Sequence, residues 1–205
     1  WSPSETKIAF INTTANSVDL YVIDVATGKA SKMNKKPLNV IMGGGATWVD
    51  DNTMLYCVAT KPSNQQPTRP LAPKGPTVQQ NLGKAAPSPT LQDLIKSPFD
   101  EQLFEFFATS QLVQNKAGVE TLIGKPAIYS TVSLSPDKNY LMVRTIKKPF
   151  SYLVPYYRFP QITVVYDING NEIKTVNEVP LNEISPKGFM STRTGKRNMA
   201  WRSDV

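Results

Sequence analysis

The chain has 205 residues, of which 40% are hydrophobic and 19% are charged, as is typical of a folded globular protein. The formal net charge of +7 permits an acidic partner, but no nucleic-acid-binding motif accompanies it, and we expect no nucleic-acid partner. There is no histidine and only one cysteine, Cys57, which excludes a Ser-His-Asp triad, an internal disulfide and the usual zinc sites. We therefore expect no catalytic centre, metal or cofactor within these residues.

The chain opens on WSPSETK, already inside a structural pattern, and we interpret it as a trimmed fragment. No signal peptide and no apolar run of transmembrane length is visible, so no membrane association is predicted. Localisation stays open, with a periplasmic or secreted bacterial protein as the working hypothesis.

Two patterns recur along the chain. In the first, a Ser-Pro turn leads into an apolar run, as in WSPSETKIAF (1–10) and LSPDKNYLMV (134–143). In the second, an apolar run ends at an aspartate that precedes a glycine turn, which aligns Asp24 with Asp167. A third copy, WVDDNTMLYC, starts at Trp48, and WRSDV at Trp201 resembles the beginning of a fourth.

Each copy predicts turns and strands. Proline fixes φ, while Ser or Asp caps free backbone N–H groups, and Thr-Gly or Asn-Gly indicates a hairpin. The resulting unit has four antiparallel strands that are apolar on both faces, so each unit stacks on its neighbours as propeller blades do. An ordinary β-sandwich is the alternative, but the register match between copies favours the propeller.

We therefore predict an all-β fold: a β-propeller fragment of about three four-stranded antiparallel blades, with one Pro-rich insertion carrying a short helix. Three whole blades and the start of a fourth are expected, at residues 1–40, 46–125 with insertion 61–98, 129–180 with inserted loop 147–160, and 199–205.

The insertion at 61–98 is rich in Pro, Gln, Asn and Ser and is predicted to be an extended excursion. Near its end, Thr90 is expected to cap a short helix that carries Leu91, Leu94 and Ile95 and stops near Pro98. The blade is expected to resume with the strand LFEFFATSQLVQ. Because 61–98 and 147–160 leave corresponding strand connections, we expect them to emerge on the same face and act together.

Four segments now resemble a known family: WSPSETKIAFINTTANSVDLYVIDVATGKA, LQDLIKSPFDEQLFEFFATSQL, IGKPAIYSTVSLSPDKNYLMV and above all KKPFSYLVPYYRFPQ. They are similar to the N-terminal propeller of prolyl oligopeptidase family serine peptidases, in the glutamyl endopeptidase branch. The resemblance implies a downstream α/β-hydrolase domain as partner, a peptide substrate, and a cavity between the domains that admits peptides. It also implies that these residues alone are catalytically inactive.

Arg158 is the strongest candidate for substrate contact, since a bidentate arginine suits the carboxylate of a glutamyl peptide. The alternatives are stacking on aromatic residues or an ion pair across the domain interface. Hydroxyls of Tyr152, Tyr156 and Tyr157 are candidate ligands of the substrate backbone, or else these rings pack against the hydrolase domain. Arg144, inside a strand, is a weaker candidate for which an ion pair within the blade is the alternative.

Two functions follow. The first is the non-catalytic propeller part of a glutamyl-endopeptidase-like serine peptidase, gating and helping to bind peptides. The second is a stand-alone propeller that acts as a protein-interaction scaffold without peptidase activity. An incomplete ring leaves blade faces unpaired, so we also expect self-association.

Overall fold

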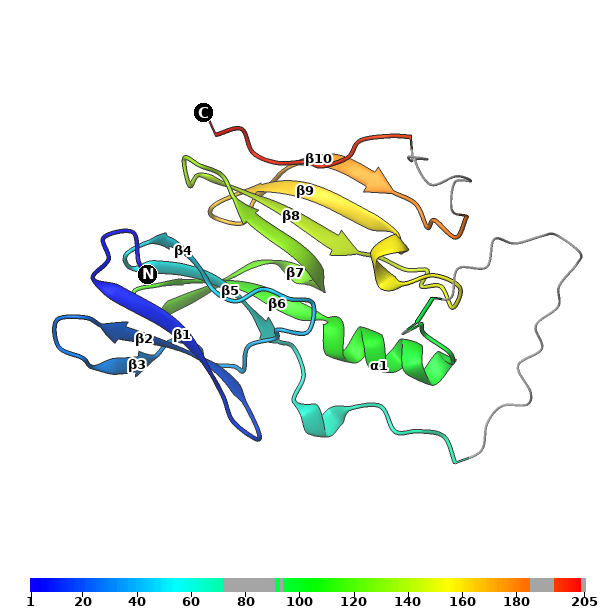
Figure 1. Ribbon diagram of the computed structural model, residues 1–205, viewed down its shortest axis with the longest axis horizontal. Coiled ribbons are helices and arrows are strands. Elements are labelled where there is room, and N and C mark those ends of the chain that lie inside the picture. Colours follow the sequence, from blue (N-terminus) through cyan, green and yellow to red (C-terminus); the bar gives the residue numbers. More distant parts are fainter. Residues whose placement is uncertain (72–90, 93, 185–193, 204–205) are drawn as a thin grey trace, which may run out of the picture.

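The computed structural model describes residues 1–71, 91–92, 94–184 and 194–203. It is mostly β, and its antiparallel strands form two sheets that lie side by side (Figure 1). The smaller sheet has the order β1-β2-β3. Its strands are β1 (Lys7–Thr13), β2 (Val18–Asp24) and β3 (Ala30–Lys32).

The larger sheet has seven strands in the order β10-β9-β8-β7-β6-β5-β4, so every strand pairs with its neighbours in sequence. Its strands are β4 (Thr47–Asp50), β5 (Thr53–Ala59), β6 (Ser110–Lys116), β7 (Val119–Leu134), β8 (Tyr140–Ile146), β9 (Gln161–Asp167) and β10 (Glu172–Val179). An all-antiparallel meander is the arrangement that the hairpin turns predict.

The seven strands divide at β7, which belongs to two successive units. Its first part, Val119 to Ala127, pairs with β6, and its second part, from Ile128 onward, pairs with β8. Gly124, whose φ of +63° suits glycine, lies close to this junction. Unit two (β4 to the first part of β7) and unit three (the rest of β7 to β10) are therefore four-stranded meanders.

Unit one, formed by β1–β3, has three strands among the described residues, where four were predicted. By their turns, β1, β2 and β3 correspond to β8, β9 and β10, which are the second, third and fourth strands of the later unit. Unit one therefore lacks a counterpart of the first strand among the described residues. Residues 199–203 form no strand, and 204–205 lie outside the described residues, so the start of a further blade stays a prediction. The division of the chain into blades at the expected boundaries is likewise a prediction.

The predicted repeat is confirmed in its first turn. The Ser2 hydroxyl accepts a hydrogen bond from the Lys7 backbone N–H at 3.1 Å, and the Ser135 hydroxyl accepts one from the Tyr140 N–H at 2.9 Å. In both turns the residue three positions after the serine is left-handed, with φ of +61° at Glu5 and +63° at Lys138. The two Ser-Pro turns therefore have the same geometry.

The aspartate turns are confirmed as well. The Asp24 carboxylate accepts hydrogen bonds from the backbone N–H and the hydroxyl of Thr27, at 2.9 and 2.7 Å. The Asp167 carboxylate accepts bonds from the N–H groups of Asn169 and Asn171, at 2.9 and 2.8 Å. The Thr27 bonds lower the pKa of Asp24, and a bond from the Asn171 side-chain amide, together with the backbone bonds, lowers the pKa of Asp167. Both aspartates are therefore charged acceptors that close their turns.

The core consists of layers between stacked units. Alternate residues of β5 point to opposite faces: Met54, Tyr56 and Val58 pack against unit one, while Leu55 packs with Leu141 of unit three. Strands that are apolar on both faces are thus buried on both faces, as the sequence predicts.

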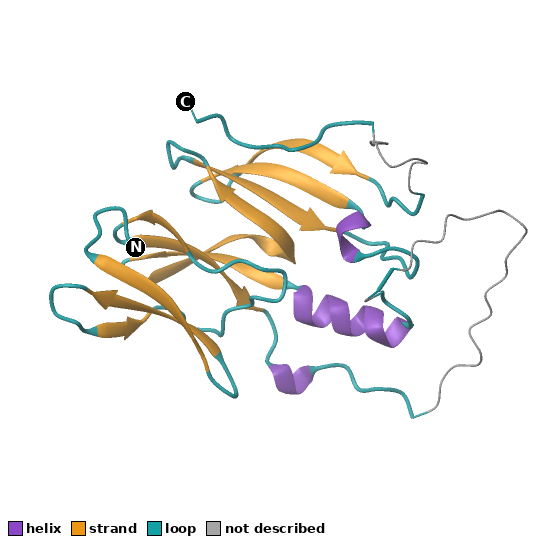
Figure 2. Cartoon of the chain, in the orientation of Figure 1, coloured by secondary structure: helices purple, strands orange, loops and turns teal. Residues whose placement is uncertain are grey.

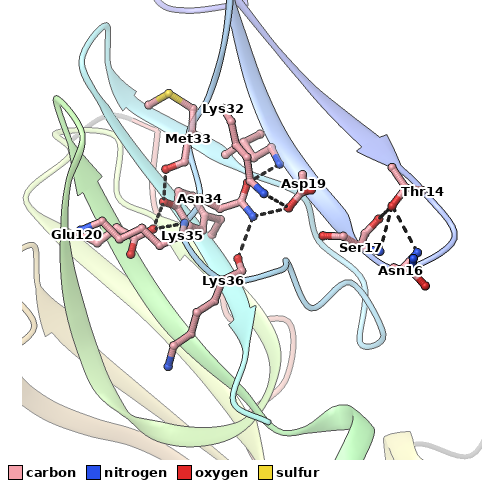
Figure 3. Close-up of polar contacts among 12 residues, drawn as sticks. Thr14, Asn16, Ser17, Asp19, Lys32, Met33, Asn34, Lys35, Lys36 and Glu120 are labelled. Carbon is pink, nitrogen blue, oxygen red and sulfur yellow. Dashed lines mark hydrogen bonds and ion pairs between the residues drawn. The ribbon is translucent and has the colours of Figure 1, made fainter. Parts of the chain in front are cut away.

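Polar contacts fasten unit one to unit two (Figure 3). Asn115, fully buried on β6, donates to the Met33 carbonyl at 2.9 Å and to the Tyr56 hydroxyl at 3.0 Å. Glu120 accepts from the Tyr56 hydroxyl at 3.0 Å and from the Lys35 backbone N–H at 2.9 Å. The segment after β3 is therefore held against unit two by side chains of β5, β6 and β7.

The helical segments gather at one end of the sheets (Figure 2). They are the 3-10 turns η1 (Ser63–Gln65) and η2 (Tyr156–Arg158) and the α-helix α1 (Pro98–Ala108). No helix in the described part of the chain is long and apolar enough to cross a membrane.

The predicted position of the α-helix is wrong. Residues 91, 92 and 94–96 are not helical, and Thr90 lies outside the described residues. The helix instead begins where it was expected to stop, at Pro98, and occupies much of the expected strand LFEFFATSQLVQ. Proline at the first helical position lacks only an N–H that would be unpaired there, so it starts this helix rather than ending one.

Candidate functional site

Three strand connections meet at the end of the sheets where the helices lie. They join β1 to β2 (14–17), β5 to β6 (60–109) and β8 to β9 (147–160). The second and third are long excursions between the second and third strands of their units, as predicted. Buried Ala108, Ile128, Ile146 and Phe159 share one apolar cluster at this end, so the two excursions emerge together.

Helix α1 is fixed at its start by the sequence Ser97-Pro98-Phe99-Asp100. The Ser97 hydroxyl accepts a hydrogen bond from the Asp100 backbone N–H at 3.2 Å, which caps the helix. Asp100 and Glu101 place negative charge in the first turn, where the helix dipole favours it. This Ser-Pro-x-Asp pattern was the available sequence signal for the helix, and it was read as an end instead.

An aromatic cluster joins α1 to the loop 147–160. The Phe104 ring lies 5.1 Å from Phe150 and 5.9 Å from Phe159, both edge-on, and Phe150 stacks on Phe159 at 5.3 Å. Phe159 is 1% exposed. Such pairs add to the hydrophobic gain from burial, so helix and loop form one packed body.

Two polar contacts cross the same boundary. The Lys148 ammonium lies 2.8 Å from a Glu105 carboxylate oxygen, a contact that raises the pKa of Lys148. The Tyr152 hydroxyl donates to Glu101 at 3.1 Å. Burial first, and then the bond to Glu101, raises the pKa of Tyr152, because both favour the neutral hydroxyl that donates this bond. Sequence reasoning missed both glutamates, because Glu105 was assigned to a strand and Glu101 to the stretch between the insertion and that strand.

The loop presents large side chains to solvent on this fixed base. Tyr156 and Tyr157 are 49% and 55% exposed, and Leu153 is 59% exposed, whereas the neighbouring Val154 and Phe159 are buried. A gathering of exposed aromatic side chains on an ordered segment is typical of a contact surface. We refer to Tyr152, Leu153, Tyr156 and Tyr157 as the aromatic face.

Arg158, half-buried, is the last residue of η2 and adjoins the aromatic face. Its backbone N–H donates to the Pro155 carbonyl at 2.9 Å, and its carbonyl accepts from Asn182 at 3.1 Å. The structure therefore brings four predicted site residues, Arg158 and the three tyrosines, into one loop with a constrained backbone.

Arg144, the remaining candidate, is outside this loop. It lies in β8 next to Val143, which packs toward unit two, so alternation places Arg144 on the opposite face of the sheet. The ion pair expected within the blade is not found, since Arg144 pairs with no acidic residue in the described part of the chain.

No protein-family model matches the chain. A "Probable glutamyl endopeptidase, chloroplastic" from Oryza sativa subsp. japonica is 37% identical over 196 residues, which cover 93% of this chain and 21% of the rice protein. A protein of the same name from Arabidopsis thaliana is 33% identical, over 100% of this chain and 22% of its own length. The chain is homologous to the N-terminal region of plant glutamyl endopeptidases. It spans about a fifth of the length of these relatives.

Among solved structures, an uncomplexed acylaminoacyl peptidase from Pyrococcus horikoshii matches 87% of this chain with a TM-score of 0.49 and 16% identity, over 24% of its own chain. TolB from Acinetobacter baumannii matches 89% with a TM-score of 0.28 and 11% identity, over 44% of its chain.

Proposed function

We propose that this chain is the non-catalytic propeller part of a glutamyl-endopeptidase-like serine peptidase, where it gates access to and helps bind peptide substrates. The homology to glutamyl endopeptidases over 93% of the chain carries the proposal. Catalysis would belong to an α/β-hydrolase domain elsewhere in the parent protein, because a chain without histidine cannot supply a Ser-His-Asp triad.

The stacked units support the propeller assignment. Units two and three are consecutive four-stranded meanders that pack face to face through Leu55 and Leu141, and unit one packs on the other side of unit two. Repeated meanders with a buried layer between neighbours are what propeller blades require.

The aromatic face supports a role at the entrance of a substrate cavity. It belongs to a loop that α1 braces through Phe104 and through the bond between Glu101 and Tyr152. A braced loop loses little conformational entropy when it meets a peptide or a partner domain, which favours contact at low cost. Arg158 adjoins this face, and its guanidinium offers the planar fork that pairs with a carboxylate.

The role of Arg158 is tested in the full-length enzyme with peptides that carry either Glu or Gln at the cleavage site. We expect Arg158→Ala to weaken transition-state binding of Glu peptides by roughly 2–4 kcal/mol, the usual cost of breaking a desolvated charge pair. The kcat/KM for the Gln peptide should change far less, because that peptide has no charge to pair.

Arg197→Ala is the control for net charge, because it removes an exposed arginine that lies outside the loop. A preference for Glu over Gln that survives Arg158→Ala would show that Arg158 acts on structure and not on the substrate carboxylate. A preference that survives in Arg158→Lys would show that charge suffices without the fork.

The complete coding region separates this proposal from the scaffold function. A downstream Gly-x-Ser-x-Gly elbow, followed by an aspartate and a histidine, is expected for a hydrolase domain. A reading frame that stops after the propeller would instead leave the interaction scaffold as the function.

A further inference from the structure

The outer edge of β1 is the place where a first strand of unit one would lie. In unit three the corresponding strand, β8, pairs with β9 on one side and with Ile128–Leu134 of β7 on the other. In the part of the chain that the structure describes, β1 pairs with β2 alone. Such an edge presents a row of backbone N–H and C=O groups to which another strand can be added.

The Ser-Pro turn directs the backbone onto this edge. The Ser2 N–H donates to the Lys7 carbonyl at 2.8 Å, and the Ser2 hydroxyl accepts from the Lys7 N–H at 3.1 Å. The same two bonds join Ser135 to Tyr140, at 2.9 Å each, and there the residues before the serine continue as the strand beside β8. Because the two turns match, a backbone that leads into Ser2 is set to run antiparallel to β1.

The N-terminal end of the chain is also fixed against unit two. The Ser4 N–H and hydroxyl both donate to the Asp51 carboxylate, at 2.9 and 2.7 Å, and the Lys7 ammonium donates to the Asp51 carbonyl at 2.8 Å. The chain therefore starts beside the turn between β4 and β5 (Figure 1). A strand along the outer edge of β1 would thus lie next to β4.

Two tryptophans that recur at the starts of units differ in one bond. The Trp201 indole N–H donates at 3.2 Å to the carbonyl of Ser133, which belongs to the first strand of unit three. Trp48 lies in β4, the first strand of unit two, and packs against unit one. Its indole N–H is buried and has no hydrogen-bond partner among the described residues. A buried donor without an acceptor is costly and rare, so this one points to a contact made elsewhere in the parent protein.

The repeat identifies the acceptor that Trp48 requires. Aligning the two turns places Ser135 on Ser2, so Ser133 falls on the position directly before Trp1. A carbonyl at that position would stand to Trp48 as the Ser133 carbonyl stands to Trp201. By the same alignment Leu134 falls on Trp1, and Ile128–Ser133 fall on the six positions before it.

We propose that the outer edge of β1 binds a strand of the parent polypeptide, formed by the roughly six residues that precede Trp1 there. The carbonyl next to Trp1 accepts the Trp48 indole N–H. The region shared with the two plant relatives is 21% and 22% of their length, so their polypeptides extend well beyond it. The proposal stands on the repeat and on Trp48, and it does not depend on the peptidase assignment.

Hydrogen exchange measured by NMR, with nitrogen-15 in the tryptophan indoles and the backbone, tests the proposal. This chain is compared with a longer form that begins about ten residues before Trp1 in the parent sequence. We expect the Trp48 indole N–H to exchange about fivefold more slowly, or slower still, in the longer form. The Trp201 indole is the internal control and should exchange equally in both forms, because its acceptor is present in both.

The backbone of β1 gives a second readout in the same experiment. The Lys7 N–H points to the turn, and alternation along the strand places the N–H groups of Ala9 and Ile11 on the same edge. Their exchange should also slow in the longer form. A third form with a Gly-Ser repeat of equal length before Trp1 should behave like the unextended chain, since such a repeat disfavours a strand.

Unchanged exchange of the Trp48 indole in the longer form would overturn the proposal, as would equal slowing by the Gly-Ser form. Slowing that depends on protein concentration would overturn it too, because the added strand would then come from a second copy.

Trp48→Phe keeps an aromatic ring and removes the indole N–H. We expect it to lower the Tm of the longer form by about 2–4 °C more than the Tm of this chain, because only the longer form makes the bond. Trp201→Phe is the matched control and should lower both Tm values equally. Equal Tm shifts from Trp48→Phe in the two forms would contradict the acceptor assigned to Trp48.

Discussion

At the scale of single residues, Asp19 shows how a charged group is kept inside the first sheet. It is 7% exposed, and one carboxylate oxygen contacts both the Lys32 ammonium and the Asn34 side-chain amide, each at 2.9 Å. Asn34 in turn accepts from the Leu20 backbone N–H at 2.7 Å. A buried charge is tolerated when it is paired and hydrogen-bonded in this way.

The Lys32 contact and then the Asn34 bond lower the pKa of Asp19, against burial, which acts to raise it. A lowered pKa in the folded state means that the stabilisation is present above the ordinary aspartate value of 3.8 and is lost as the pH falls through the folded pKa. We predict that Asp19→Asn lowers the free energy of unfolding by about 1 kcal/mol at pH 7. The difference from the unmodified chain should shrink below pH 4.

Urea unfolding at pH 7 and at pH 3 measures this difference. A cycle with Lys32→Gln gives the matched control, because the coupling between Asp19 and Lys32 should be present at pH 7 and weaker at pH 3. A coupling that is the same at both pH values would contradict the role given to the charged carboxylate.

At the scale of elements, α1 and the loop 147–160 depend on each other. The loop has no sheet partner of its own, and its ordered backbone rests on Phe150 and Phe159 packing against Phe104 of the helix. The helix has few contacts with the sheets apart from those at its C-terminal end, where Ala108 is buried. The loop also packs on Ile128 and Ile146 of the sheet, so the aromatic contacts with α1 are one of two supports that order it.

Phe104→Ala tests this dependence. Truncation of a fully buried phenylalanine to alanine lowers the free energy of unfolding by about 3–5 kcal/mol, and we expect a loss of about 2 kcal/mol for the half-buried Phe104. Hydrogen exchange should become faster in residues 98–108 and 147–160 while β1–β3 keep their protection. Phe107→Ala, at an exposed position of the same helix whose ring contacts Phe106, is the control. An equal effect on the loop from both variants would refute a specific link through Phe104.

At the scale of the whole molecule, stability comes from the layers between units. The contacts between units one and two include the fully buried Asn115, whereas Gln114, the next residue along β6, points to unit three and donates to the Ile168 carbonyl at 3.1 Å. Strand β6 thus bonds to unit one and to unit three through alternate side chains. The self-association expected from the uncovered sheet faces stays a prediction.

Asn115→Leu should remove the bonds that Asn115 makes to the Met33 carbonyl, the Tyr56 hydroxyl and the Gly118 N–H, and it should destabilise the fold by about 2–4 kcal/mol. Hydrogen exchange is expected to rise mainly in β1–β3. Gln114→Leu, its matched control, should instead affect β8–β10 and at a smaller cost, because Gln114 is only half-buried. If both variants loosen the same strands, the units are not separately fastened.

The sequence by itself determined the repeating parts of this protein. The Ser-Pro turns, the aspartate turns and the two-faced apolar strands were read correctly, because each depends on residues within about ten positions of one another. Hydrogen bonds within a turn and the alternation of side chains along a strand are local, so they survive without knowledge of the rest of the chain.

Only the tertiary structure decided where α1 lies and what it touches. The capping signal of α1 is local, but a proline such as Pro98 is found both at the first position of a helix and just after the end of one. Packing of the helix on Phe150 and Phe159 decides that a helix begins at Pro98. The contact between Glu101 and Tyr152 joins residues 51 positions apart. Such sites arise from the stacking of units, a long-range event that turn chemistry and periodicity do not encode.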